Sequence, residues 1–223
     1  DAYFDLLGST TGSDELPNLL SALTTNVSHF FREEHHFEIL RKQIIPELKS
    51  KTKSGDRVRI WSAGSSNGQE LYSIAMTLLE EFPEFLKSDF KLLGTDIDPA
   101  VVSTANQGHY LNNQLKGLSD ARLKRFFVAD KDGKGATVSS ELRSCVNFKI
   151  LNLIRDWPMR HPFDVIFCRN VVIYFDEATQ NRLWSRFESI MKPGAWLFLG
   201  HSERVQDMSK RNLRTAGITA YRR

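Results

Sequence analysis

The sequence predicts a doubly wound α/β fold, in which a parallel, Rossmann-like sheet has helices on both faces. The first reason is that apolar β-type segments alternate with amphipathic helical patterns along most of the chain. The second is a strand, a glycine-rich turn and a helix over residues 58–81, followed by a strand that ends on Asp96. Doubly wound domains hold a nucleoside with elements in this order.

The alternating elements begin at residue 58. The helix after the second strand is marked at both ends, because Asp98 and Pro99 are typical of an N-cap and a first turn and Gly108 of a C-terminus. Ser119 and Asp176 are N-cap candidates for two later helices, and Pro193-Gly194 is expected to end the second of these. The expected strands are 58–62, 90–95, 163–168, 196–200 and 218–221.

Two parts of the chain depart from this alternation. Asp132-Gly133 lies between β-type residues, which is a hairpin signal, so a small antiparallel β insertion is expected at about 127–153. Residues 28–48 have a helical pattern, and residues 49–56 are a polar linker. We therefore expect a short N-terminal helical segment with its linker over residues 1–50 and the α/β domain over residues 51–223.

Composition is that of an ordinary globular protein. The chain has 223 residues, of which 41% are hydrophobic and 26% charged, enough for one core and a small accessory unit. The formal net charge is +3, and the sequence has no run of like-charged residues, so a nucleic-acid partner is not expected. Because no apolar run approaches the ~20 residues of a membrane span, membrane insertion is not expected either. Cys145 and Cys168 are too few for a disulfide framework, which favours a cytoplasmic location.

The turn at residues 64–68 fits three kinds of site, because its glycines allow close approach to the backbone. As a dinucleotide loop it lacks a third glycine, and Asp96 falls 32 residues after Gly64, where about 20 are usual. As a G-x-S-x-G elbow it would make Ser66 a hydrolase nucleophile with His201 as a partner, although no oxyanion loop precedes it. As an adenosylmethionine loop it would place Asp96 against the ribose hydroxyls. A tight turn without any ligand is the plain alternative.

Other polar residues stand where ligands of such folds bind. Asp96 is expected at the carboxyl edge of the sheet and free for a ligand, because Asp98 already caps the next helix. Arg169 and Asn170 follow a central strand and should reach the same edge. Arg32 is suited either to a surface ion pair or to orienting a carboxylate through two parallel hydrogen bonds.

Histidine and cysteine spacings do not predict a metal site. His35 and His36 are adjacent and are expected on different helix faces, and no HExxH motif is present. His201 is expected to be structural or exposed. Cys168 has no histidine beside it and is expected to be a small buried hydrophobe instead of a nucleophile.

Five segments together resemble those of the chemotaxis receptor methyltransferases, the CheR family, over residues 20–222. Each segment is a weak signal alone, whereas five in the same order are specific. The resemblance implies a class I methyltransferase sheet and makes residues 1–50 the remnant of the family's N-terminal helical domain. The segments are 24–33, 61–76, 95–98, 163–175 and 197–203.

The resemblance also implies a function. A CheR-type enzyme is a cytoplasmic protein-glutamate O-methyltransferase that transfers a methyl group from S-adenosylmethionine to glutamates of chemoreceptors and leaves S-adenosylhomocysteine. Arg32 and Tyr174 match positions near the transferred methyl group and are the expected catalytic residues. The expected cofactor-binding residues are Asn26, Ser28, Arg32, Gly64, Glu70, Asp96, Asn152, Leu153, Arg169 and Asn170.

The chain departs from the family pattern in two places. The family usually has Cys-Ser-Thr-Gly-Glu-Glu at residues 65–70, where this chain keeps only the glycine, the last glutamate and one serine. The family's N-terminal helical domain is mostly missing from this chain. Some members bind a receptor's C-terminal peptide at the β insertion. A serine hydrolase using Ser66 and a non-enzymatic adenosylmethionine sensor stay open as alternatives.

Overall fold

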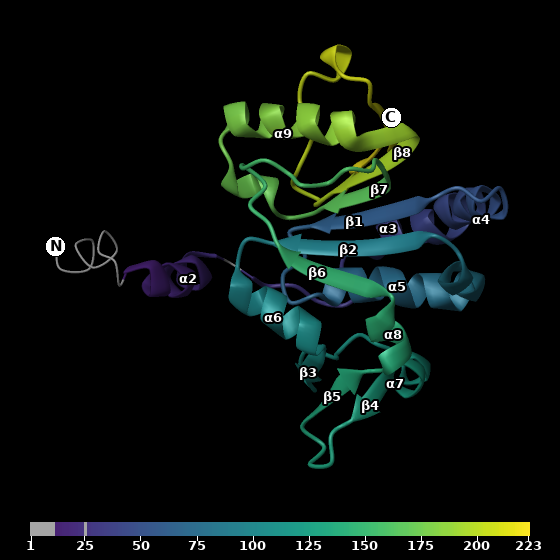
Figure 1. Cartoon of the computed structure of the whole chain (residues 1–223), viewed down its shortest axis with the longest axis vertical. Coiled ribbons are helices and arrows are strands. Elements are labelled where there is room, and N and C mark those ends of the chain that lie inside the picture. The colour runs from purple at the N-terminus through teal and green to yellow at the C-terminus, as the bar shows by residue number, and fades with distance from the viewer. Residues whose placement is uncertain (1–11, 25) are drawn as a thin grey trace.

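A seven-stranded sheet runs through the computed structural model, which describes residues 12–24 and 26–223 (Figure 1). Its order is β6-β2-β1-β7-β8-β10-β9. The first five strands are parallel, and β10 is antiparallel to both β8 and β9. The bounds are β1 Val58–Ala63, β2 Phe90–Asp96, β6 Val146–Ile150, β7 Phe163–Cys168, β8 Met191–Leu199, β9 Arg214–Gly217 and β10 Ala220–Arg222.

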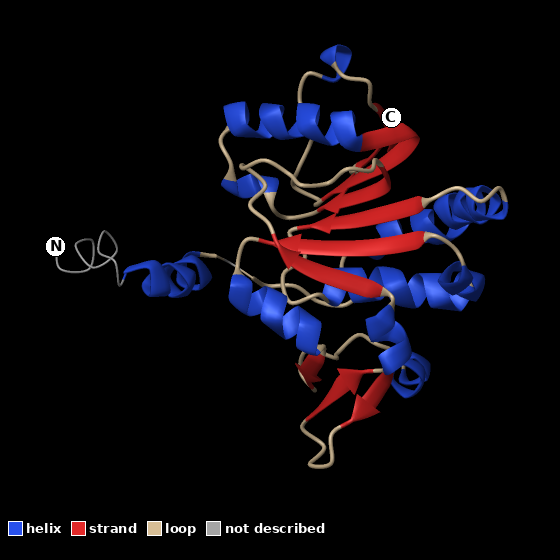
Figure 2. Cartoon of the chain, in the orientation of Figure 1, coloured by secondary structure: helices blue, strands red, loops and turns tan. Residues whose placement is uncertain are grey.

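Helices cover both faces of this sheet, as the prediction of a doubly wound fold requires (Figure 2). Alternate residues of a strand point to opposite faces. Phe198 of β8 therefore joins the core beneath α3, α4 and α5, while Leu197 and Leu199 join the core beneath α9. The helices are α2 Gly12–Leu23, α3 Glu34–Ile39, η1 Leu40–Ile44, α4 Ile45–Lys53, α5 Gln69–Glu81, η2 Pro83–Lys87, α6 Pro99–Gln107, α7 Asp120–Phe126, α8 Ser140–Ser144, η3 Val172–Tyr174, α9 Glu177–Ile190 and η4 Met208–Lys210.

Local signals predicted the helix ends well, with one exception. The Asp98 side chain accepts a hydrogen bond from Ala100 N at the start of α6, and Gly108 ends that helix with φ 65°. Ser119 and Asp176 likewise cap α7 and α9. The expected end of α9 at Pro193-Gly194 is wrong, because the helix ends at Ile190 and both residues lie within β8.

The antiparallel insertion is present, but its expected bounds are wrong. A separate three-stranded sheet has the order β3-β5-β4, with β3 His109–Leu111, β4 Phe127–Ala129 and β5 Gly135–Val138. Strand β6 instead extends the main sheet beside β2. Only Phe148 is buried in β6, so this edge strand is exposed to a degree that also suits a hairpin strand.

The N-terminal helices belong to the main core. Helices α3, η1 and α4 follow one another without interruption, and Phe37, Leu40, Ile44 and Leu48 are buried in the cluster that also contains Ile60 of β1. The expected division at residue 50 therefore does not coincide with a packing boundary. Residues 1–11 and Thr25 of the expected N-terminal segment lie outside the described residues. Within the described part of the chain, no helix has the length and apolar character of a membrane span.

Candidate functional site

A cavity of about 320 Å³ lies at the carboxyl ends of β1, β2 and β7. In the sheet, β2 lies on one side of β1 and β7 lies on the other. The direction in which successive strands are added to the sheet therefore reverses between β1 and β7. Ligands of open α/β sheets bind at such a reversal. All the residues predicted to bind the cofactor or act in catalysis line this one cavity: Asn26, Ser28, Arg32, Gly64, Glu70, Asp96, Asn152, Leu153, Arg169, Asn170 and Tyr174.

The glycine turn brings the backbone of β1 against the next strands. Gly64 has φ +85°, which favours glycine, and a side chain there would overlap Val171. The N–H groups of Gly64 and Ser65 both donate to Thr95 O at 2.8 Å. The turn therefore lies directly beside the end of β2, and its tight approach leaves room for a ligand above it.

Asp96 is held rigidly at the end of β2. It is only 9% exposed, and its carboxylate accepts hydrogen bonds from Ser66 N at 2.8 Å and Asp98 N at 3.2 Å. Burial raises the pKa of Asp96 above its ordinary value, and these N–H donors oppose the shift. An oriented carboxylate at a cavity wall is well suited to accept hydrogen bonds from the two hydroxyls of a sugar.

Arg169 is the buried cation of the site. Its side chain is 2% exposed and lies 3.1 Å from a Glu70 oxygen and 3.4 Å from a Glu33 oxygen. It also donates to the backbone carbonyl of Arg32. Burial raises the pKa of Glu70, whereas Arg169 and the Ser62 hydroxyl, 2.7 Å away, favour its ionised form. One guanidinium thus joins β7, α5 and the segment before α3.

The predicted catalytic residues both line the cavity, and they come from different parts of the chain, Arg32 from the segment before α3 and Tyr174 from η3. The Arg32 guanidinium donates to Val27 O at 3.1 Å, and Tyr174, at the end of η3, is 59% exposed. His29 also lines the cavity, although it was not among the predicted site residues. Burial lowers the pKa of His29, and the nearby Arg32 charge reinforces this shift. His29 belongs to the motif 24–33, which was the only signal for it in the sequence.

The remaining predicted residues shape the cavity walls. Asn26 donates to Asp98 Oδ2 at 2.7 Å, which attaches the segment before α3 to the start of α6. Asn152 accepts a hydrogen bond from Ile154 N at 2.8 Å, and Leu153 is buried beside it. Ser28 lies on the wall that also carries Arg32. Further lining residues that were not among the predicted cofactor-binding and catalytic residues are Leu23, Thr24, Val27, Ser66, Ile97, Leu151, Ile154, Val171 and Phe175.

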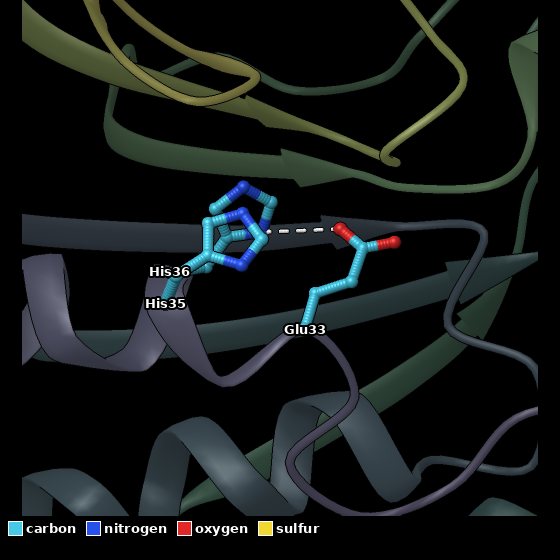
Figure 3. A group of neighbouring side chains, drawn as sticks. All are labelled: Glu33, His35 and His36. Carbon is cyan, nitrogen blue, oxygen red and sulfur yellow. Dashed lines mark ion pairs between the residues drawn. The ribbon is translucent and has the colours of Figure 1, made fainter.

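Glu33, His35 and His36, which do not line the cavity, form a close group with ligand-type atoms within 4.8 Å of one another (Figure 3). The expectation that the two histidines point apart is wrong, because their ring centroids are 4.1 Å apart. The His36 Nδ1 atom faces Glu33 at 3.5 Å, and Arg169 supplies a positive charge to the same Glu33 oxygen.

The buried His36 side chain is expected to make the folded protein less stable in acid. Burial lowers the pKa of this fully buried histidine to about 3, and the nearby Arg169 charge reinforces the shift. Between about pH 3 and 6.5 the unfolded chain therefore binds the proton that the folded chain excludes, so stability falls as pH falls. From pH 7.5 to 5 we expect a loss of about 2 kcal/mol from this group. Urea unfolding at the two pH values should show this loss in the wild type and a smaller one in His36→Gln.

The arrangement around Ser66 does not provide a nucleophile and base. The Ser66 hydroxyl donates to Asn26 O at 2.8 Å. The His201 ring is 2.9 Å from the Ser202 hydroxyl and faces Glu33. Among the described residues, no histidine is hydrogen-bonded to Ser66. The geometry therefore gives no support to the hydrolase interpretation of the turn.

Comparisons with known proteins show which family the chain belongs to. Residues 26–222 match the family model described as the CheR methyltransferase, SAM-binding domain. A probable chemotaxis protein methyltransferase of Rhizobium etli is 46% identical over 99% of this chain and 83% of its own length. The chemotaxis protein methyltransferase of Escherichia coli is 39% identical over 94% of this chain and 71% of its own length. With a family match over almost its whole length and a ligand-sized cavity at the expected sheet edge, the chain belongs to the CheR methyltransferases and is an S-adenosylmethionine-dependent methyltransferase of the chemotaxis type.

Proposed function

We propose that this chain is a protein-glutamate O-methyltransferase that methylates chemoreceptor glutamates in chemotaxis adaptation. The observation that supports it best is the cavity at the β1–β7 reversal, where a buried acid, a buried ion-pair network, Arg32 and Tyr174 share one space. The similar proteins of Rhizobium etli and Escherichia coli, which are named chemotaxis methyltransferases, favour the same substrate class. A cytoplasmic location is part of the proposal.

The lining residues suit S-adenosylmethionine part by part. Asp96 would accept hydrogen bonds from the ribose, and Ile97 and Leu151 offer apolar contact to a base. The Arg169 guanidinium lines the cavity and would attract a ligand carboxylate. Glu70, on the same wall, would pair with an ammonium group. The bound cofactor would supply an electrophilic methyl group on a sulfonium.

The acceptor needs positioning more than it needs a base. A glutamate side chain has an ordinary pKa of ~4.3 and is therefore already a carboxylate at neutral pH. No group in the cavity therefore has to act as a base toward this acceptor. Catalysis would then depend on holding the carboxylate in line with the methyl group, and orientation of reactants can lower a barrier by up to ~7–11 kcal/mol.

Arg32 and Tyr174 are placed to do this positioning. The Arg32 guanidinium can form two parallel hydrogen bonds to a carboxylate, and its bond to Val27 O limits its rotation. A carboxylate that is fully neutralised would be a poorer nucleophile, so Arg32 is proposed to orient it while the exposed Tyr174 phenol adjusts its final approach. Both side chains touch the space that the acceptor must enter.

Single-turnover methylation tests these roles. We expect Arg32→Ala to lower the rate of methyl transfer to receptor membranes about 100-fold, because misplacement of a reactant by about 1 Å costs this much. Tyr174→Phe removes a single hydroxyl and should lower the rate by less, about 10-fold. Affinity for S-adenosylhomocysteine should change less than the rate. Arg57→Ala is the control, since Arg57 lies before β1 and is far from the carboxyl edge of the sheet. Unchanged rates in both test variants would show that neither Arg32 nor Tyr174 acts in catalysis.

The small antiparallel sheet is proposed to bind a receptor's C-terminal peptide. Strands β3 and β4 are its two edges, and they expose Leu111 and Val128. An edge strand can pair with an extended peptide, while exposed apolar side chains contact alternate residues of that peptide. Titration with a receptor C-terminal peptide should give saturable binding, and a scrambled peptide should not bind. If neither peptide binds, the proposed peptide site is wrong, and the receptor contacts the enzyme only through its methylated region.

The sensor alternative predicts the same cofactor binding but no turnover. Incorporation of labelled methyl groups into receptor membranes separates the two functions, because a sensor would bind S-adenosylhomocysteine and leave the receptor unmodified. We expect incorporation as base-labile methyl esters.

A further inference from the structure

Glu203, in the turn after β8, is a buried carboxylate that binds a row of backbone N–H groups. The residue is 3% exposed. One oxygen accepts from Val171 N and Val172 N, both at 2.8 Å, and from Ile173 N at 3.3 Å. The other accepts from Asn170 N at 2.9 Å and Gly200 N at 2.6 Å. Five N–H donors thus converge on one side chain.

These donors take the place of an ion pair. Among the described residues, no lysine, arginine or histidine is ion-paired with Glu203. A carboxylate in a buried position needs charge stabilisation, and hydrogen bonds from several N–H groups provide it. Bonds to a charged acceptor are also stronger than those between neutral groups, so the segment that carries the donors is held firmly.

The segment held by Glu203 is the one that lines the cavity after β7. Asn170 has φ 60°, in the left-handed region that asparagine adopts more readily than most residues other than glycine. Tyr174 follows directly, at the end of η3. Both Asn170 and Tyr174 face the cavity, and Glu203 itself does not line it. The carboxylate therefore acts on the site only through the backbone it binds.

Gly200 makes this arrangement possible. A Cβ atom at Gly200 would lie 2.5 Å from Asn170 Nδ2 and 2.8 Å from Asn170 N, which is too close for either atom. The absence of a side chain lets the end of β8 approach the end of β7, so that Glu203 can reach across. Two residues on one strand connection, Gly200 and Glu203, thus define the position of the neighbouring connection.

We propose that Glu203 is a positioning residue for methyl transfer, which fixes the backbone of residues 170–173 and through it the placement of Asn170 and Tyr174. This proposal rests on the proposed function for the role of Tyr174. The clamp itself, defined as Glu203 with the five N–H groups it binds, is a property of the folded chain and can be measured without a substrate.

Amide hydrogen exchange tests the clamp directly. Glu203→Gln leaves one acceptor oxygen and turns an NH₂ group toward N–H donors, so the amides of residues 171–173 should exchange about 30-fold faster. Amides of β1 should exchange at the wild-type rate, which would show that the change is local. Glu188→Gln is the matched control, because Glu188 also accepts from a backbone N–H, that of Asn212 at 3.0 Å, but outside the cavity.

A kinetic cycle tests the link to catalysis. We expect Glu203→Gln to lower the single-turnover rate about 30-fold, and Tyr174→Phe to add little in the Glu203→Gln background, because residues that act through one another are not additive. Glu203→Asp retains the charge on a shorter side chain and should recover part of the rate. Fully additive losses, or unchanged exchange at residues 171–173 in a folded variant, would overturn the proposal. An inactive wild type would refute the proposed function while leaving the exchange result intact.

Discussion

Arg169→Ala is expected to lower the free energy of unfolding by about 3–5 kcal/mol. The guanidinium is 2% exposed and is shared by Glu70 and Glu33, so its removal leaves two partly buried carboxylates without their cation. It also removes a donor from the carbonyl of Arg32. Uncompensated buried charge is among the few causes of losses this large.

Urea unfolding of matched variants measures this effect. Arg57→Ala breaks an exposed ion pair with Asp89 and should cost less than 1 kcal/mol. The double variant Arg169→Met, Glu70→Gln should be more stable than Arg169→Ala, because it removes one of the stranded charges and refills the space. A loss in Arg169→Ala as small as that in Arg57→Ala would show that water already reaches these carboxylates.

Asp96→Asn is expected to weaken the affinity for S-adenosylhomocysteine about 30- to 100-fold. Hydrogen bonds to a charged acceptor contribute about 1.5–3 kcal/mol, and a buried, oriented carboxylate has lost the water that would otherwise compete. The asparagine side chain is uncharged and presents one acceptor oxygen instead of two. Ser66 N already donates to the carboxylate, so the amide cannot satisfy both the turn and the ribose.

Calorimetry at pH 7.5 provides the measurement. Asp130→Asn is the control, since Asp130 pairs with His109 beside the small antiparallel sheet and does not line the cavity. The melting temperature of Asp96→Asn should stay close to that of the wild type if the turn keeps its shape. An unchanged affinity in a folded Asp96→Asn protein would mean that the ribose is bound elsewhere.

The sequence was informative wherever the signal was local. Asp98, Pro99 and Gly108 mark both ends of α6, because caps act within one turn of the helix. The rule that the carboxyl ends of parallel strands share one edge was enough to bring Asp96 and Asn170 into the same cavity.

Contacts between residues far apart in the sequence could not be predicted from these local signals. Strand β6 was assigned to the insertion because its pairing with β2 depends on residues some 54 positions away, Leu92 and Val146. The contact between the His35 and His36 rings depends on how the whole N-terminal segment docks on the sheet. Glu203 was visible only as part of a motif, since nothing in its neighbours indicates that its side chain binds the backbone that follows β7.

A crystal structure with S-adenosylhomocysteine tests the central claim most directly. We expect the ribose hydroxyls within hydrogen-bonding distance of the Asp96 carboxylate and the sulfur facing the space between Arg32 and Tyr174. A ligand bound at another surface, or one whose sulfur is turned away from these two side chains, would contradict the proposed site.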